Sequence, residues 1–515
     1  MKRLPVFLIL MLIGITASPQ MDTIKTDAGY ISGIKSSDDV VHIYKGIPFA
    51  APPVGELRWK APQPVAHWQG VKKCNVFAAS PMQNKPVPFM MYTEPYLIPS
   101  SPINEDCLYL NVWTTAKSSG EKKPVMVWIY GGGFVSGGTA CAIYDGENIA
   151  KKDVVFVSIP YRVGVFGFLA HPELTKESKG KSSGNYALLD QIAALHWIQK
   201  NIAAFGGDAN NVTIIGQSAG AFSVNALVAS PLAKGLFKRA IAESGGMFSA
   251  DGNAISLQAA EKNGEDFFKK LNATSVEALR KIPADSLQKL AASFRSAPVI
   301  DGYVLPKDVY DIFNNDEQND VAVLTGWNAD DGFPSNNIPD AATYTQNAKE
   351  KYGSLADEYL KAFPGNNNDE IYHSVFALNR DNVFAWQAYT WAKLETTKGH
   401  NNVYVYLFKH TSPGQEKYGA FHSSEIPFAL DNLHTWNLEW MDADKKLADV
   451  MSTYWTNFAK TGNPNGNSLA EWQPFNSSEN KIMVLDVDEQ GMQPIPVMNE
   501  FNFLDKYQSY LRNGK

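Results

Sequence analysis

The chain is poor in cysteine, with only Cys74, Cys107 and Cys141 among its 515 residues. No Cys-x-x-Cys pair occurs, and no cysteine stands in a cluster with the spacing of metal ligands, so no metal site is expected. Two interpretations remain open for the three thiols. They are buried small hydrophobes, or two of them form a disulfide and leave one thiol over.

The sequence also lacks long runs of basic residues. Its 46 Lys and Arg residues against 53 Asp and Glu residues give a net charge of −7 and a pI of about 5.8. A nucleic-acid-binding chain usually carries a basic face, so no nucleic-acid partner is expected. Hydrophobic residues make up 44% of the chain, which excludes a mainly disordered protein because so many apolar side chains can bury a large core.

Long hydrophobic runs are missing apart from one near the N-terminus. There, Lys2 and Arg3 precede the apolar stretch 4–15, and small residues follow it. Because about 20 apolar residues are needed to span a bilayer, the pattern predicts a signal peptide over residues 1–19 rather than a membrane anchor. We therefore expect an exported protein, periplasmic or secreted. The remainder, residues 20–515, shows no repeat or linker and is expected to form one domain without membrane attachment.

Short apolar runs rich in β-branched residues alternate with helical patterns along the rest of the chain. These runs show no polar alternation, which indicates strands buried on both faces, as in a parallel sheet. The predicted strands are 124–130, 154–159, 212–215, 239–242, 321–324, 403–408 and 482–485. Helical patterns cover 188–202 and begin again at Ala219. The order predicts a doubly wound, mostly parallel α/β sheet, with helical insertions near 251–297 and 340–400 over the carboxyl edge of the strands.

The strongest local motif is Gly216-Gln217-Ser218-Ala219-Gly220, which matches G-x-S-x-G between a predicted strand and a predicted helix. In that context the turn is so tight that its middle residue takes a strained backbone conformation. Its hydroxyl then stands at a helix N-terminus, where the dipole favours a developing negative charge. We interpret Ser218 as a nucleophile; the alternative is a glycine-rich turn without chemistry.

A glycine-rich segment after the predicted strand 124–130 supplies candidate donors for an oxyanion. The run Gly131-Gly132-Gly133-Phe134 lets backbone N–H groups turn into a cavity with no side chain in the way. The N–H groups of Gly132 and Gly133, together with that of Ala219, are expected to hold the oxyanion. A flexible turn without function is the alternative.

A serine nucleophile needs a base and a carboxylate that orients the base, and in this type of sheet they follow in the order serine, acid, histidine. After the strand 321–324, Asp330 and Asp331 are both eligible as the acid. Further on, His410 directly follows a strand and His422 lies in a loop. The residues alone do not separate these alternatives.

Four further segments make the sequence similar to the type-B carboxylesterase and cholinesterase family over nearly the whole mature chain. They flank the glycine loop and the serine motif and cover Tyr44–Ala50, Asn104–Asn111, Phe205–Asp208 and Trp455–Pro464. The resemblance implies a single α/β-hydrolase domain that hydrolyses small-molecule carboxylic esters through an acyl-enzyme. It implies no metal and no cofactor.

The same resemblance assigns the ambiguous positions. The family's acid maps to Asp331, where Glu is usual, and its histidine maps to His422 in a Gly-x-x-His-x-x-Glu loop. Ser244 maps to a serine that lies beside the triad. Gln217 replaces the usual Glu before the nucleophile, which removes a negative charge from the pocket. Glu425, in the histidine loop, is expected to fix that loop rather than to react.

Other matches to the family concern the scaffold. The resemblance implies two structural ion pairs, Arg58 with Glu105 and Arg162 with Asp190. We treat these four residues as part of the framework and not of the chemistry.

Two departures from the family pattern bear on substrate and disulfides. Leu97 occupies the region where the family places the tryptophan that binds the choline ammonium, so cholinesterase specificity is not implied. Met82 stands where the usual disulfide partner of Cys107 is found, and Cys74 is the substitute that the chain offers.

Two other functions remain open at this point. One is a specialised esterase for aromatic esters such as feruloyl groups, in which Phe89-Met90-Met91-Tyr92 lines the pocket; a packed loop is the alternative for that segment. The other is a non-catalytic binding protein, because some relatives are adhesion domains. Those relatives typically lose triad members, whereas this chain retains all of them.

Overall fold

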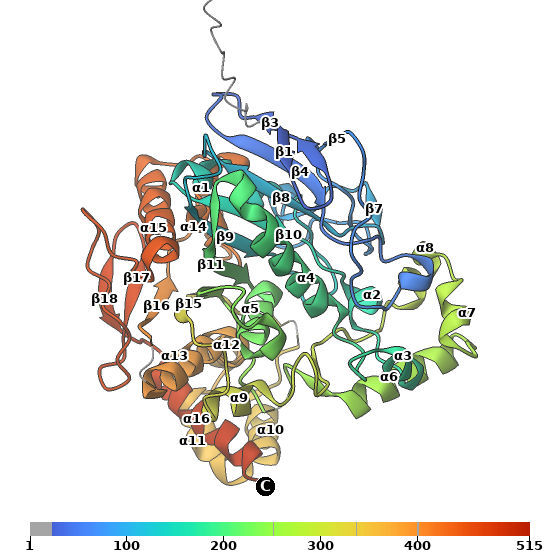
Figure 1. The fold of residues 1–515 in the computed structure, drawn as a ribbon. Helices are drawn as coiled ribbons and strands as arrows, with labels where there is room; N and C mark the ends of the chain where they lie inside the picture. The colour runs from blue at the N-terminus through green and yellow to red at the C-terminus, as the bar shows by residue number, and fades with distance from the viewer. Residues whose placement is uncertain (1–22, 251, 336, 399–400, 515) are drawn as a thin grey trace, which may run out of the picture.

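The central feature of the fold is a large, mostly parallel β-sheet (Figure 1), seen in a computed structural model that describes residues 23–250, 252–335, 337–398 and 401–514. Within these residues the strand order is β18-β17-β16-β15-β12-β11-β9-β10-β8-β4-β3. The strands from β17 to β10 run parallel, while β18 at one edge and β8, β4 and β3 at the other pair antiparallel. The predicted fold class is confirmed.

The inner strands of the central sheet are largely buried, whereas the edge strands β3 and β18 are partly or fully exposed. In chain order the strands of this sheet are β3 (Ile34–Lys35), β4 (His42–Pro48), β8 (Tyr109–Thr114), β9 (Lys123–Ile129), β10 (Val155–Ile159), β11 (Gly207–Gln217), β12 (Arg239–Glu243), β15 (Ala322–Asn328), β16 (Val403–Phe408), β17 (Lys481–Leu485) and β18 (Gly491–Pro494). Small ribbons outside it comprise β1 (Thr23–Lys25), β2 (Tyr30–Ser32), β5 (Val71–Lys73), β6 (Ser80–Pro81), β7 (Ile103–Asn104), β13 (Ile255–Ser256) and β14 (Val299–Ile300).

The seven predicted strands correspond to the seven parallel strands. Every residue of β10 and β16 is buried, as expected of strands covered on both faces. The structure extends β11 well before the predicted segment 212–215, and its register against β9 shifts between Gly207 and Val212. The antiparallel edge strands β4, β8 and β18 were not predicted.

Helices cover both faces of the sheet (Figure 1): α4, α5 and α13 lie on one face, and α1 and α15 lie on the other. The helices are α1 (Glu147–Lys151), α2 (Gly164–Phe168), α3 (Pro172–Glu177), α4 (Tyr186–Asn201), α5 (Ala219–Ala229), α6 (Leu257–Lys270), α7 (Val276–Arg280), α8 (Ala284–Leu290), α9 (Val309–Asn314), α10 (Ala341–Tyr352), α11 (Ala356–Ala362), α12 (Asn368–Arg380), α13 (Trp386–Lys398), α14 (Ile426–Ala429), α15 (Asp442–Thr461) and α16 (Met498–Arg512). Both predicted helical insertions are present, as α6 to α8 and as α10 to α13.

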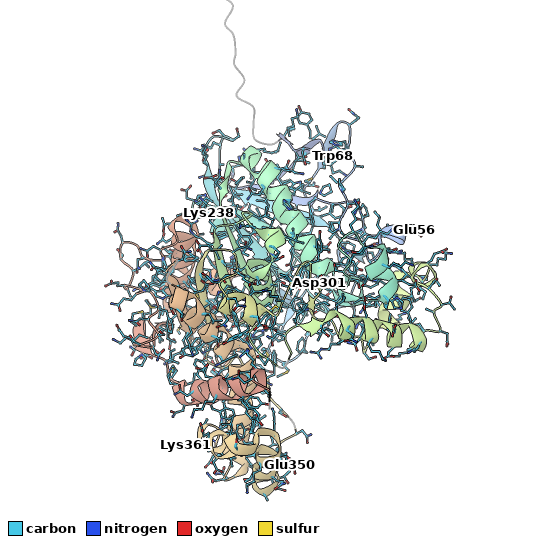
Figure 2. All side chains as sticks on the ribbon, turned by 60° about the horizontal axis from the view of Figure 1, so that its bottom comes forward. Glu56, Trp68, Lys238, Asp301, Glu350 and Lys361 are labelled. Carbon is cyan, nitrogen blue, oxygen red and sulfur yellow. The ribbon has the colours of Figure 1, made fainter. Side chains whose placement is uncertain are left out.

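The second insertion lies at the far end of the molecule from the N-terminal ribbon. In Figure 2, Glu350 and Lys361 mark α10 and α11 at one end, and Trp68 lies near the opposite end. Among the described residues, no helix combines the length and apolar character required to cross a bilayer. The predicted signal peptide, residues 1–19, lies outside the described residues and stays a prediction.

Two buried ion pairs connect segments that are distant in the sequence. Arg58 lies 2.6 Å from Glu105, and Arg162 lies 2.8 Å from Asp190, with all four side chains less than a tenth exposed. Arg58 also donates to the carbonyl oxygen of Ile282 at 2.8 Å, which anchors the first insertion to the N-terminal part of the chain. Both pairs implied by the family resemblance are confirmed.

The three cysteines are all free and buried. The interpretation as small hydrophobes is confirmed, and Cys74 does not replace the missing disulfide partner of Cys107. Burial raises the pKa of the Cys74 thiol to about 11, which keeps it in the unreactive protonated form.

Candidate active site

Ser218 occupies the sharp turn between β11 and α5. Its φ of 57° and ψ of −125° place it in a region that non-glycine residues rarely adopt, at a cost of about 1–3 kcal/mol. The amide of Ser218 donates to the carbonyl oxygen of Glu243 at 2.9 Å, which fastens the turn to the next strand. A Cβ on Gly220 would stand 2.0 Å from the carbonyl oxygen of Ile129, so only glycine allows this approach. The turn presents Ser218 at the wall of a cavity.

His422 and Asp331 form a buried hydrogen-bonded pair, and His422 lines the same cavity as Ser218. His422 Nδ1 lies 2.8 Å from Asp331 Oδ1. Because a carboxylate only accepts, Nδ1 carries the proton, and Nε2 is left as the basic nitrogen. Asp331 Oδ2 accepts from Ser244 Oγ and from the amide of Asn328, each at 2.8 Å. The carboxylate is therefore held in a single orientation.

The two alternatives that the sequence left open take other places. Asp330 Oδ2 accepts a hydrogen bond from the amide of Ala420 at 2.9 Å, so it fastens the histidine loop and does not meet the imidazole. His410 is buried elsewhere, with Nε2 2.9 Å from Asp444 and Nδ1 3.4 Å from Asp486. Neither Asp330 nor His410 is among the described residues that line the cavity.

Aromatic rings that the sequence reading missed enclose the imidazole of His422. Phe384 stacks on it with centroids 4.2 Å apart, and Phe333 meets it edge-on at 5.5 Å. Phe384 belongs to a π-helical turn, Asp381–Ala385, a type of distortion that often marks functional sites and has no sequence signature. Tyr92 also supports the loop, because its hydroxyl donates to the carbonyl oxygen of His422 at 3.0 Å.

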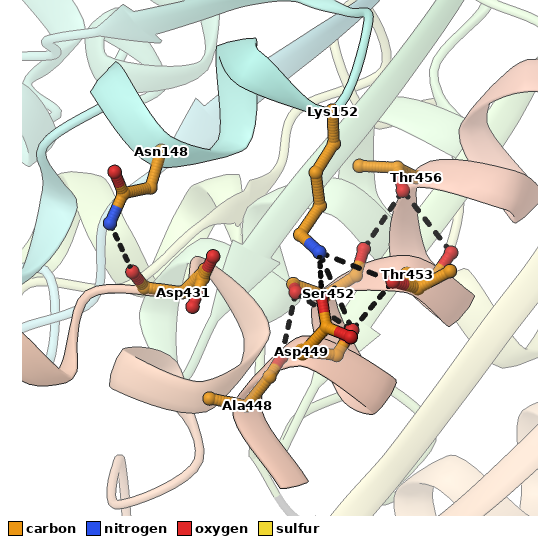
Figure 3. Close-up of polar contacts among 8 residues, drawn as sticks. All are labelled: Asn148, Lys152, Asp431, Ala448, Asp449, Ser452, Thr453 and Thr456. Carbon is orange, nitrogen blue, oxygen red and sulfur yellow. Dashed lines mark hydrogen bonds and ion pairs between the residues drawn. The ribbon is translucent and has the colours of Figure 1, made fainter. Parts of the chain in front are cut away.

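Helix α1 contacts both the segment that follows α14 and helix α15, as Figure 3 shows. Asn148 on α1 donates to the carbonyl oxygen of Asp431 at 2.8 Å, just after α14. Lys152 on the same helix forms an ion pair with Asp449 of α15 at 2.6 Å. Through these contacts, α1 connects the chain that follows the histidine loop to α15.

Gln217 places a neutral amide beside the base. Its side chain is buried, with Nε2 3.3 Å from His422 Nε2 and 3.5 Å from His422 Nδ1. Because Nδ1 is bonded to Asp331, Nε2 is the nitrogen that is able to accept from this amide. The Gln217 amide thus lies against the imidazole nitrogen that Asp331 leaves free.

The predicted oxyanion donors lie together on the cavity wall. Gly132 and Gly133 both have positive φ, 116° and 60°, which turns their amides out of the strand direction. Among the described residues no backbone acceptor pairs with either amide. Ala219 heads α5, where the first N–H groups lack intrahelical partners. Tyr130 fixes the start of the loop, because its hydroxyl donates to the carbonyl oxygen of Tyr161 at 2.8 Å.

The cavity has a volume of about 870 Å³, and aromatic side chains form part of its wall. Rings from separate segments line it, among them Phe89, Tyr92, Phe134, Phe222, Phe333 and Phe384. Of the candidate pocket segment 89–92, Phe89 and Tyr92 line the cavity, whereas Met91 is buried and Met90 is exposed. Among the described residues, no group of His, Cys, Asp or Glu is suited to hold a metal ion.

Two buried glutamates lie behind the site, and both favour the protonated form. Burial raises the pKa of Glu243 to about 8, although Trp455 Nε1 donates to its carboxylate. Burial and the nearby Glu243 raise the pKa of Glu425 well above its usual range. Asn328 Nδ2 donates to Glu425 and to the carbonyl oxygen of Phe421, which gives Glu425 the loop-fixing contact expected of it.

We expect the buried Glu243 to make stability fall as the pH rises. The folded state holds its proton up to about pH 8, whereas the unfolded chain releases it above about pH 4.5, so folding is progressively disfavoured between these values. In Glu243→Gln, the free energy of unfolding, measured by urea denaturation, will fall less between about pH 5 and about pH 8 than in the wild type. The exposed Glu471→Gln serves as the control. Equal pH slopes for Glu243→Gln and the wild type would contradict the assignment.

The chain is similar to known proteins over most of its length. The model of the carboxylesterase family matches residues 20–504. A fumonisin B1 esterase from Sphingopyxis macrogoltabida is 34% identical over 90% of this chain and 88% of its own length. A para-nitrobenzyl esterase from Bacillus subtilis (strain 168) is 32% identical over 90% of this chain and 94% of its own. A solved structure of PNB esterase superposes with a TM-score of 0.81 at 30% identity, covering 94% of this chain and 99% of that one.

Proposed function

The chain belongs to the carboxylesterase family and is a carboxylic ester hydrolase, and we propose that it forms an acyl-enzyme on Ser218 with His422 as the base. Asp331 orients the base and stabilises its protonated form. The observation that carries the proposal is the 2.8 Å hydrogen bond from His422 to Asp331, made by an imidazole that lines the same cavity as the strained Ser218. No metal or cofactor takes part in the proposed reaction.

In the first half of the reaction, Ser218 Oγ attacks the carbonyl carbon of the ester while its proton moves to His422 Nε2. The electron pair of the carbonyl bond moves to oxygen, where the amides of Gly132, Gly133 and Ala219 are placed to receive the charge. Each such donor is worth about 3 kcal/mol in the transition state. The bond to the alcohol oxygen then breaks, and His422 returns the proton to the leaving alcohol.

In the second half, water replaces the alcohol. His422 Nε2 takes a proton from the water as its oxygen attacks the acyl carbon, and the same amides hold the second oxyanion. The bond between Ser218 Oγ and the acyl carbon then breaks, the free acid leaves, and His422 gives the proton back to Ser218. The sum is one ester and one water converted to one acid and one alcohol, with the enzyme restored.

The cavity supports esters with a large apolar part. Relatives of the chain include esterases named for fumonisin B1 and for para-nitrobenzyl esters. The cavity of this chain has a volume of about 870 Å³, and aromatic rings line part of its wall. An aromatic acyl or alcohol group would stack against rings such as Phe89 and Tyr92. The feruloyl-type activity considered from the sequence is one member of this wider class.

The acyl-enzyme is tested by competition between water and methanol. Esters of one acid with several different alcohols share one acyl-enzyme if the proposal is right, because the alcohol has left before water or methanol attacks. The ratio of free acid to methyl ester, measured by chromatography at a fixed methanol concentration, will therefore be the same for all of them. A ratio that changes with the leaving alcohol would show direct attack by water on the ester and would contradict the proposal.

A further inference from the structure

The wall of the cavity carries positive charge and no described carboxylate. Among the described residues that line it, none is Asp or Glu, whereas Lys85 and Arg295 are both present. This is the reverse of the chain as a whole, in which acidic residues outnumber basic ones by 53 to 46. The excess of positive charge is therefore a property of the described cavity lining and does not follow from the composition of the chain.

Neither cation has an ion-pair partner among the described residues. Arg295 Nη2 donates to the carbonyl oxygen of Gly252 at 3.1 Å, a neutral acceptor, and no ion pair involves Arg295 among the described residues. Lys85 has no ion-pair partner within the described chain either. Both side chains are exposed, so they stand at the solvent side of the cavity while the reacting groups lie deeper. A guanidinium of this kind keeps donors free for a carboxylate.

The two cations come from segments that meet at the cavity. Lys85 follows Asn84, whose Oδ1 accepts from Gln288 Nε2 at 3.4 Å. Gln288 belongs to α8, and the chain continues from that helix to Arg295. The segment before Phe89 and the segment after α8 are thus joined, which places the two positive charges on connected parts of one wall.

Near the candidate nucleophile, the described lining of the cavity contains no carboxylate that would repel an anion. Gln217, next to the nucleophile, is a neutral amide beside His422. Asp331 is fully buried behind the imidazole, where the side chains of His422 and Ser244 occupy its oxygens. A negatively charged group that enters with the ester therefore meets Lys85 and Arg295 without a competing acidic side chain from the described lining.

We propose that the cavity selects esters that carry a carboxylate away from the scissile bond, with Arg295 as the principal contact and Lys85 as the second. The substrate class is half-esters of dicarboxylic acids and esters of similarly charged alcohols. The inference rests on the proposed esterase function and adds the charge of the substrate to it. Because both cations are exposed, the attraction is moderate and weakens as salt screens it.

The test uses three 4-nitrophenyl esters with six-carbon acyl chains that differ only in the far end. Adipate monoester ends in a carboxylate, hexanoate ends in a methyl group, and 6-aminohexanoate ends in an ammonium group. The wild type will hydrolyse the anionic ester with a kcat/KM at least about tenfold above the cationic one at low ionic strength, mainly through KM, and about 0.5 M NaCl will reduce the difference.

Substitutions of the two cations show which residue is responsible for the preference for the anionic ester. In Arg295→Gln, the anionic-to-neutral ratio of kcat/KM will fall about twofold to threefold, and in Lys85→Gln by less, because each removes one exposed positive charge from the wall. Arg295→Lys keeps the charge and will keep most of the ratio, and Arg295→Glu will favour the cationic ester. Lys289→Gln, on α8 but outside the lining, makes the same change in net charge and will leave the ratio as it is.

The outcomes separate this inference from the proposed function. Equal kcat/KM for the three esters in the wild type, or an equal loss of all three in Arg295→Gln, would overturn the charge selection while the esterase stands. Failure of the wild type to hydrolyse even the neutral hexanoate would instead overturn the esterase.

Discussion

Replacing Ser218 by alanine will lower kcat for a neutral 4-nitrophenyl ester by about 10⁴-fold to 10⁶-fold, because the variant has no atom that can carry the acyl group. What remains is catalysis by the oxyanion amides and by binding alone. The fold should be unaffected, since no hydrogen bond of the Ser218 hydroxyl occurs among the described residues and alanine removes only that hydroxyl. Steady-state kinetics and thermal unfolding of the same preparation measure both properties.

The matched control for Ser218→Ala is Ser136→Ala. Ser136 lines the same cavity, but its hydroxyl donates to the carbonyl oxygen of Gly132 at 3.2 Å and has no histidine partner. We expect its loss of kcat to stay below about tenfold, because no acyl group passes through it. Equal activity of Ser218→Ala and wild type, with both proteins folded, would remove the proposed mechanism.

Substitutions of His422 and His410, the two histidines that the sequence alone left open as the base, are expected to have different effects. His422→Gln will lower kcat by about 10⁴-fold or more, because glutamine cannot take the proton from Ser218. His410→Gln will instead lower the free energy of unfolding by about 1–3 kcal/mol, because it removes the buried imidazole that lies against Asp444. The kcat of the folded His410 variant should remain within a few fold of the wild type.

Both histidine variants are measured for activity and for urea denaturation, so that loss of fold is not taken for loss of chemistry. The opposite pattern, with an inactive but stable His410→Gln and an active His422→Gln, would reassign the base to His410. Asp331→Asn provides a further comparison, because it keeps the shape of the side chain while removing the charge that holds the imidazole.

The parallel centre of the sheet was predictable because its strands are apolar on both faces. β10 and β16 are continuous buried runs, and no other element gives that pattern at such lengths. The edge strands carry no such signal. β4 contains Lys45 and Gly46 and shifts its register against β8 between Tyr44 and Ile47, so its sequence does not show the regular repeat of a strand.

The strained turn at Ser218, the candidate nucleophile, was predictable because the residues that form it are adjacent in the sequence. A tight strand-to-helix turn needs small neighbours at fixed positions, and the approach of Ile129 to Gly220 shows the physical reason. The acid and the base are different, since they lie on separate loops and meet only in the folded chain. The choice of Asp331 over Asp330 depends on which carboxylate of an adjacent pair faces His422, and local sequence does not encode this.

The contacts that shape the cavity were the least predictable. Phe384 reaches His422 from a π-helical turn in a long helical insertion, where its spacing resembles that of any buried aromatic residue. Arg295 and Lys85 are exposed cations in loops, and in the sequence they look like ordinary surface charges. Their joint position on one cavity wall depends on how two distant segments pack, so the charge preference becomes visible only in three dimensions.

The account depends on Ser218 as the atom that is acylated, and covalent labelling tests this most directly. The protein is treated with a fluorophosphonate, which reacts with an activated serine hydroxyl in place of an ester, and the digested chain is mapped by mass spectrometry. We predict one label per molecule, on the peptide that contains Ser218, and none in Ser218→Ala. A label on another serine, or an unlabelled protein that still hydrolyses esters, would contradict the account.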